Sequence, residues 1–158
     1  MRKSAWKPYA LGIALAEAVG AAAGLMTRGG MQLYQSTAKK PPLSPPAPVF
    51  PLAWAGLYAL MGVGAARVWL SQKSPARSRA LRLFGTQLAF NFGWSFLFFR
   101  FRMYGPAFFW LLILLALAAG MTRAFGKADR PAALMQIPYL LWLLFAAYLN
   151  LSVWLLNP

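Results

Sequence analysis

Five long apolar stretches alternate with short polar or basic segments along this chain. Each stretch holds the ~20 residues that a helix needs to cross ~30 Å of hydrocarbon. The third is the least apolar, because Gln87 and Asn91 interrupt it. The pattern predicts an all-α integral membrane protein with a single transmembrane domain, residues 1–158. The five expected spans are residues 9–26, 47–70, 80–99, 105–125 and 132–156.

The long connection, residues 28–46, separates the first two spans and is rich in proline. The prolines from Pro41 to Pro46 cannot continue a helix and favour extended backbone. Tyr34 and the neighbouring Leu33 favour a loop that packs down over the bundle as a cap. A solvated linker is the alternative.

Composition excludes most kinds of conventional active site. The chain is 60% hydrophobic and only 11% charged, more apolar than a soluble domain of this size can bury. It has no cysteine and no histidine, which excludes thiolate and imidazole chemistry and Cys/His metal sites. Glu17 and Asp129 are the only acids, so we expect neither a carboxylate metal cage nor a catalytic carboxylate pair.

The basic residues predict membrane topology. The net charge is +14, and most bases lie between the apolar stretches, where they contact anionic lipid headgroups rather than nucleic acid. Five spans divide the 16 bases into 11 on the side of the N-terminus and 5 on the other side. The positive-inside rule therefore predicts a cytoplasmic N-terminus and an external C-terminus. Helical spans favour the bacterial cell membrane.

The two acids have different surroundings in the sequence. Glu17 lies in the middle of the first span, where an acid is either a proton or cation site or a protonated group bonded to a neighbouring helix. Asp129 lies between Lys127 and Arg130, and we expect a solvated loop charge.

The third span has two distinct faces. Gln87, Asn91 and Trp94 share one face at 100° per residue, and we expect it to look into the bundle. The opposite face carries small residues at four-residue spacing, which allow close helix approach and predict a contact with a second subunit. These residues are Gly85, Ala89 and Gly93. Packing within the same chain is the alternative, because the first span has its own series at Gly12, Ala16, Gly20 and Gly24.

Tryptophans on the inward faces predict a ligand cavity. Trp54, Trp94 and Trp142 each lie beside small or amide residues. Aromatic walls with a few amides suit a flat, largely apolar ligand with polar edge groups. Ordinary packing and an interfacial aromatic belt are the alternative.

Three sequence blocks carry a resemblance to a known family. They are KPPLSPPAPVFPLAWAGLYALMG (residues 40–62), QLAFNFGWSFLFF (87–99) and PYLLWLLFAAYLN (138–150). In this order they resemble the tryptophan-rich sensory protein/translocator protein family, also called peripheral-type benzodiazepine receptors. The resemblance extends over nearly the whole chain and suggests a bacterial member.

The resemblance implies a five-helix homodimer that binds porphyrins, sterols and synthetic aromatic ligands in a cavity capped by the first loop. By motif position, the ligand-binding residues are Tyr34, Pro46, Trp54, Asn91, Trp94, Trp142, Ala146 and Leu149. Leu33 and Leu43 stand where the family usually has aromatics, and Leu151 and Leu155 replace the animal sterol motif. The last span therefore favours a porphyrin or haem-like ligand over a sterol. We expect no obligatory cofactor.

The leading hypothesis is a membrane receptor or carrier for porphyrin-like ligands. The resemblance also implies a second hypothesis, light-dependent breakdown of bound porphyrin, in which the pocket tryptophans take part. This chain retains Trp142 in the corresponding block. A small ion-coupled transporter that uses Glu17 is the third hypothesis.

Overall fold

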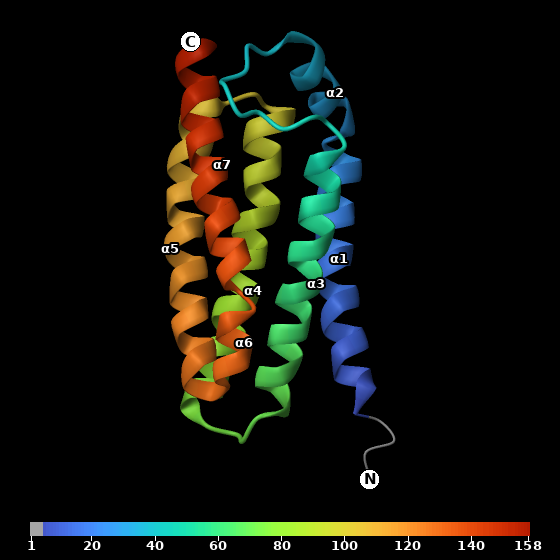
Figure 1. The fold of residues 1–158 in the computed structure, drawn as a ribbon, viewed down its shortest axis with the longest axis vertical. Helices are drawn as coiled ribbons and strands as arrows, with labels where there is room; N and C mark the ends of the chain where they lie inside the picture. The colour runs from blue at the N-terminus through green and yellow to red at the C-terminus, as the bar shows by residue number, and fades with distance from the viewer. Residues whose placement is uncertain (1–4) are drawn as a thin grey trace.

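The computed structural model describes residues 5–158, and all of their regular structure is helical. Long helices run side by side along one axis, a short helix lies at their upper end above α1 and α3, and the irregular segment after it runs across the top (Figure 1). The elements are α1 (Trp6–Met26), α2 (Arg28–Thr37), α3 (Val49–Leu70), α4 (Pro75–Ser95), the π-helical turn η2 (Phe96–Arg100), α5 (Tyr104–Ala128), α6 (Arg130–Leu134) and α7 (Ile137–Leu156).

Four segments of the described chain are long and apolar enough to cross a membrane. They are α1, α3, α5 and the α6–α7 segment Arg130–Leu156. The all-α class and the membrane character predicted from the sequence are therefore confirmed. Helix α4 lies among these segments but is less apolar, because its first turns carry Arg77, Arg79 and Arg82. The count of five crossings stays a prediction.

The cap differs from the expected loop. Residues 28–37 form helix α2, and only residues 38–48 are irregular. The prolines begin at Pro41, so nothing before that position prevents helical hydrogen bonding. Thr27 forms the corner between α1 and α2, and its hydroxyl donates to the carbonyl oxygen of Ala23 at 2.7 Å.

The last expected span is broken at its start. Helix α6 ends at Leu134 and α7 begins at Ile137, because Pro138 has no N–H group and its ring excludes the carbonyl of Leu134. Gln136, at the break, donates to the carbonyl oxygen of Leu60 at 3.3 Å and so joins this corner to α3.

The helix starts at the lower end follow capping rules. Ser74 accepts a hydrogen bond from the backbone nitrogen of Arg77 at 3.1 Å, and Pro75 follows in the first turn of α4. Asp129 does the same for α6, where Ala132 donates at 3.0 Å. Each cap satisfies a backbone donor that has no partner within the helix.

Glycines bring α1 and α3 into backbone contact. A Cβ atom at Gly12 would overlap the carbonyl group of Gly62, and a Cβ atom at Gly62 would overlap Gly12 in turn. One turn further along α1, Ala16 is fully buried, and Gly20 lies against the ring of Tyr58. The first three residues of the small-residue series of α1 therefore pack within the chain, whereas nothing lies within 4 Å of a Cβ atom on Gly24.

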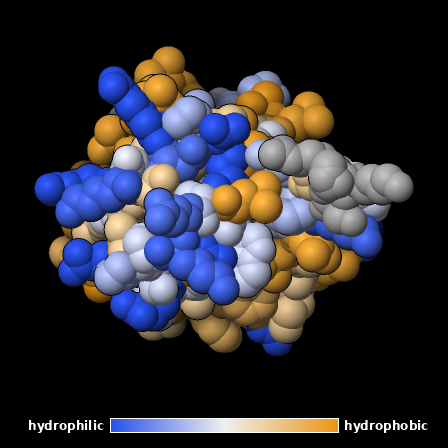
Figure 2. Space-filling model, turned by 90° about the horizontal axis from the view of Figure 1, so that it is seen from below, coloured by the Kyte–Doolittle hydropathy of each residue, from blue (hydrophilic) through white to orange (hydrophobic). Residues whose placement is uncertain are grey.

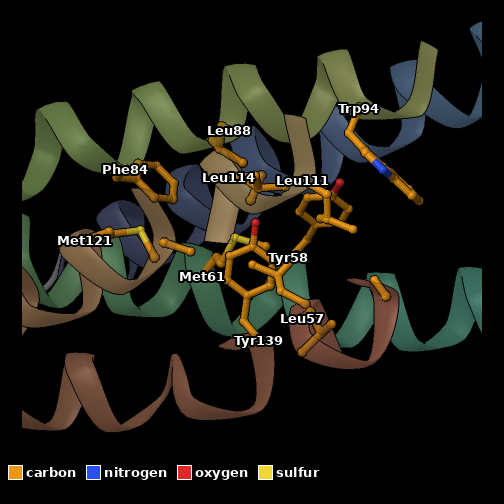
Figure 3. Packing of buried hydrophobic residues seen from close by; sticks show 14 of the residues in the cluster. Leu57, Tyr58, Met61, Phe84, Leu88, Trp94, Leu111, Leu114, Met121 and Tyr139 are labelled. Atoms are coloured by element: carbon orange, nitrogen blue, oxygen red, sulfur yellow. The ribbon is translucent and has the colours of Figure 1, made fainter. Parts of the chain in front are cut away.

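The lower half of the bundle is a solid core. Figure 3 shows side chains from several helices meeting there, including Met61, Leu114 and Tyr139. All three are inaccessible to solvent or nearly so. This core lies below the candidate site.

The lower end also carries most of the positive charge. Figure 2 shows hydrophilic side chains gathered over this end of the molecule. Exposed bases there come from the α3–α4 connection, the start of α4 and the α5–α6 corner: Lys73, Arg79, Arg82, Arg123, Lys127 and Arg130. Arg2 and Lys3, which the topology prediction also uses, lie outside the described residues.

Candidate functional site

A cavity of about 720 Å³ lies between the upper halves of the long helices, beneath α2. Its walls come from α1, α2, α3, the α4–η2 segment and α7. Helix α5 contributes no lining residue and instead supports α4 and α7 from behind. The volume lies within the range of pockets that hold drug-sized ligands.

Aromatic rings form much of the cavity wall. The Trp54 ring stacks on Tyr58 at 5.5 Å between centroids and meets the Trp142 ring edge-on at 6.2 Å. On the α4 side, Trp94 stacks on Phe98 at 5.0 Å. These rings pack against one another, so the wall is held rigid and presents flat apolar surfaces.

A chain of buried hydrogen bonds forms the floor. Tyr58 donates to Oδ1 of Asn91 at 2.7 Å, and Nδ2 of Asn91 donates to the hydroxyl of Tyr139 at 2.9 Å. Tyr139 donates to Oε1 of Gln87 at 2.6 Å, and Nε2 of Gln87 lies 3.4 Å from the sulfur of Met61. Figure 3 shows Tyr58, Met61 and Tyr139 converging. The chain joins α3, α4 and α7 and gives each of its own buried side-chain polar atoms a partner.

A second buried amide fixes the wall on the α7 side. The indole nitrogen of Trp94 donates to Oδ1 of Asn150 at 2.9 Å. Nδ2 of Asn150 donates in turn to the carbonyl oxygen of Tyr104, at the start of α5, at 2.8 Å. Asn150 therefore orients Trp94 and ties three helices together.

Tyr34 anchors α2 over the cavity. Its ring packs against those of Phe98 and Phe99, at 5.3 and 5.6 Å between centroids. The π-helical turn presents these two rings, and Gly30 allows α2 to approach it, since a Cβ atom there would overlap the backbone of Phe99. Burial, with a smaller contribution from Tyr104, raises the pKa of Tyr34 to about 12, so this side chain stays neutral.

The irregular segment after α2 is fastened to α7. The side chain of Asn157 accepts from the backbone nitrogen of Lys39 at 3.0 Å and donates to the carbonyl oxygen of Lys39 at 2.9 Å. Tyr148 donates to the carbonyl oxygen of Pro42 at 2.8 Å. Leu43, at the tip, has a φ of 72°, which a leucine rarely adopts. These bonds hold the segment across the top of the bundle.

The two acids are placed differently. Glu17 is half-buried and lines the cavity from α1. Asp129 is not the solvated charge expected from the sequence, because its Oδ2 accepts from Nε of Arg67 at 2.7 Å. Arg67 lies 62 residues earlier, on α3, so the pair closes the lower end of the bundle. This hydrogen bond, opposed by partial burial, holds the pKa of Asp129 below its usual range.

The structure brings seven of the eight residues predicted to bind ligand to this one cavity. They are Tyr34, Trp54, Asn91, Trp94, Trp142, Ala146 and Leu149. Pro46 is exposed and does not line it. That these residues bind a ligand stays a prediction.

The sequence prediction omitted several lining residues. Phe98 follows Trp94 by four residues, so helical periodicity already places it on the inward face of the third span. Phe99 faces the cavity through the π-helical turn, which the periodicity does not reveal. Tyr58 follows Trp54 by four residues, and that spacing places it on the same inward face, although the predicted ligand-binding set leaves it out.

The small-residue face of α4 packs within the chain at one end and is exposed along the rest. The position of a Cβ atom on Gly93 is taken by the indole of Trp110 from α5 of the same chain. Gly85 and Ala89 are exposed, and nothing lies within 4 Å of a Cβ atom on Gly85. Any contact with a second subunit through this face would therefore involve the middle of α4, around Gly85 and Ala89.

Comparisons with known proteins agree over most of the chain. The TspO/MBR family model matches residues 12–155. A tryptophan-rich protein TspO from Chlorobaculum tepidum is 35% identical over 155 residues, covering 94% of this chain and 95% of the relative. The translocator protein of Ovis aries is 37% identical over 152 residues, covering 94% and 89%. A tryptophan-rich sensory protein from Cereibacter sphaeroides is 36% identical over 118 residues, covering 75% and 73%.

Proposed function

This chain belongs to the TspO/MBR family of membrane proteins, and from that premise we propose a membrane receptor or carrier for porphyrin-like ligands. The observation that carries the proposal is the cavity of about 720 Å³ walled by Trp54, Trp94 and Trp142. A flat conjugated ligand gains both apolar burial and ring stacking against such walls.

Quenching of tryptophan fluorescence by protoporphyrin IX tests the ligand class. The Trp142→Ala variant should bind roughly tenfold more weakly, since one stacking surface is lost. Trp69→Phe is the control, because Trp69 is exposed near the lower end of α3, outside the cavity. Equal affinity in a folded Trp142→Ala variant would remove the support for this pocket.

We also propose that α4 is a fifth crossing. It lies among four segments that are apolar enough to span, and its polar side chains Gln87 and Asn91 are turned inward and bonded. With five crossings, the basic lower end faces the cytoplasm of a bacterial cell and contacts anionic lipid. Reporter fusions at the two ends of the chain test this, and reporters on the same side would exclude it.

A homodimer is the proposed assembly. Gly85 and Ala89 leave α4 open to close approach by a second copy. The chain has no cysteine, so Ala89→Cys introduces a single thiol. We expect oxidation in the membrane to give a covalent dimer, whereas Leu112→Cys, on the exposed side of α5, should stay monomeric. No cross-link from Ala89→Cys would count against this interface.

A second candidate function is light-dependent breakdown of bound porphyrin. The adjacent rings of Trp54 and Trp142 favour it, because both indoles lie in the cavity wall within reach of an excited ligand. Porphyrin absorbance should then fall only in the light and only with Trp142 present. Loss at the same rate with Trp142→Phe would exclude a role for this side chain.

A further inference from the structure

The two amide side chains of the inner cavity wall, Asn91 and Asn150, are already engaged within the protein. Asn91 uses its carbonyl oxygen and its amide nitrogen on Tyr58 and Tyr139. Asn150 uses its two ends on Trp94 and the backbone of Tyr104. A ligand can therefore stack on the aromatic rings of the wall made by α3, α4 and α7, whereas the oxygen and the nitrogen of each amide in this wall are already bonded within the protein.

The opposite wall has polar side chains available. Glu17, Arg28 and Gln32 line the cavity from α1 and α2. Within residues 5–158, none of these three side chains makes a hydrogen bond or an ion pair in the structure. Arg28 and Gln32 are four residues apart on α2, so they lie on the same helix face.

The two charges on this wall differ in depth. Glu17 lies near the middle of α1, and Arg28 lies beyond its upper end, as the first residue of α2. At 1.5 Å per residue, 11 residues of helix correspond to about 16 Å along the bundle. The guanidinium group is therefore at the rim and the carboxyl group is deep.

We propose that the cavity selects an amphipathic ligand with carboxylates on one edge and fixes its orientation. The proposal rests on the function proposed above. Arg28, with Gln32 beside it, binds the carboxylates at the rim, because a guanidinium pairs with a carboxylate through two parallel hydrogen bonds. Glu17 disfavours the inverted pose, which would bring like charges together at depth. The apolar body then lies against Trp54, Trp94 and Trp142.

The test compares protoporphyrin IX, which has two carboxylates on one edge, with its dimethyl ester. The readout is fluorescence quenching of the full chain in detergent. The wild type should prefer the free acid, and Arg28→Ala should weaken acid binding roughly tenfold while ester binding is unchanged. Lys39→Ala is the matched control, because Lys39 is an exposed cation at the same end that does not line the cavity.

Coproporphyrin, whose carboxylates are spread over all edges, tests the deep acid. The wild type should bind it weakly, and Glu17→Gln should strengthen binding several-fold without changing affinity for the dimethyl ester. An unchanged affinity for coproporphyrin in Glu17→Gln would overturn the part assigned to Glu17.

The remaining outcomes separate this inference from the proposed function. Equal binding of acid and ester to the wild type would overturn the inference alone, and so would equal losses in Arg28→Ala and Lys39→Ala. A parallel loss of acid and ester binding in Arg28→Ala would assign that residue to cavity shape rather than to the carboxylates. Failure of both compounds to bind the wild type would overturn the proposed function together with the inference.

Discussion

The hydroxyl of Tyr139 donates to Oε1 of Gln87 at 2.6 Å, across 52 residues of chain. The hydroxyl oxygen of Tyr139 also accepts from Nδ2 of Asn91 at 2.9 Å. All three side chains are buried, so this one hydroxyl satisfies two groups of α4 from its position on α7.

Replacing Tyr139 by Phe should lower the free energy of unfolding by about 1–3 kcal/mol, because a buried acceptor and a buried donor lose their partner. Denaturant titration in mixed micelles measures this difference. The double variant with Gln87→Leu should lose less than the sum of the two single changes, since the orphaned carbonyl is removed. Strict additivity would mean that the bond contributes nothing.

Replacing Gly62 by Ala should destabilise the bundle by about 1–3 kcal/mol, because the added methyl group would overlap the backbone of Gly12 and push α1 away from α3. Gly56→Ala on the same helix is the control. Nothing lies within 4 Å of a Cβ atom there, so that change should be neutral or stabilising by up to about 1 kcal/mol. The melting temperature should therefore fall in Gly62→Ala and stay the same or rise in Gly56→Ala.

Replacing Asp129 by Ala should cost about 1–2 kcal/mol of stability at neutral pH, since both the cap of α6 and the pair with Arg67 are lost. Asn at this position keeps a capping oxygen and should cost less. Arg67 lowers the pKa of Asp129 in the folded state. The stabilisation is therefore complete above the pKa of an unfolded aspartate, ~3.9, and disappears as the pH falls through the lower folded value.

The pH dependence provides the check on this pair. Wild type and Asp129→Asn should differ in melting temperature at pH 7 and converge as the pH falls below 4. A difference that persists unchanged under acid conditions would exclude the ion pair as its source.

Replacing Asn157 by Ala should loosen the segment after α2, because both bonds to the backbone of Lys39 are lost. Limited trypsin digestion in detergent measures this through the rate of cleavage after Lys39. We expect faster cleavage than in the wild type. Ser152→Ala, one turn earlier on α7, should leave the rate unchanged, and equal rates in all three proteins would contradict the fastening role of Asn157.

The helices were predictable because membrane thickness fixes their length. The expected spans agree with the structure to within a few residues at most ends, and the largest shift is the start of α4 at Pro75 rather than residue 80. The sequence pattern did not predict helix α2, because the prolines that follow it favour extended backbone and the whole of residues 28–46 was expected to share that conformation. The absence of proline before Pro41 was the available signal.

The faces of the helices were predictable, but the partners of their polar groups were not. Helical periodicity correctly turned Asn91 and Trp94 inward. Whether an inward amide is available to a ligand depends on side chains from other helices, here Tyr58 and Tyr139 for Asn91. The error on Asp129 has the same cause, because its partner Arg67 is remote in sequence.

The solid core beneath the cavity has a consequence for movement of material across the membrane. Gln87, Met61 and Tyr139 form the deep side of the floor and are inaccessible to solvent. Within residues 5–158 these side chains close the cavity toward the basic end, so in this conformation it is a dead-end pocket. A ligand that enters beneath α2 has to leave by the same opening unless the floor rearranges, so passage through the bundle requires a second conformation.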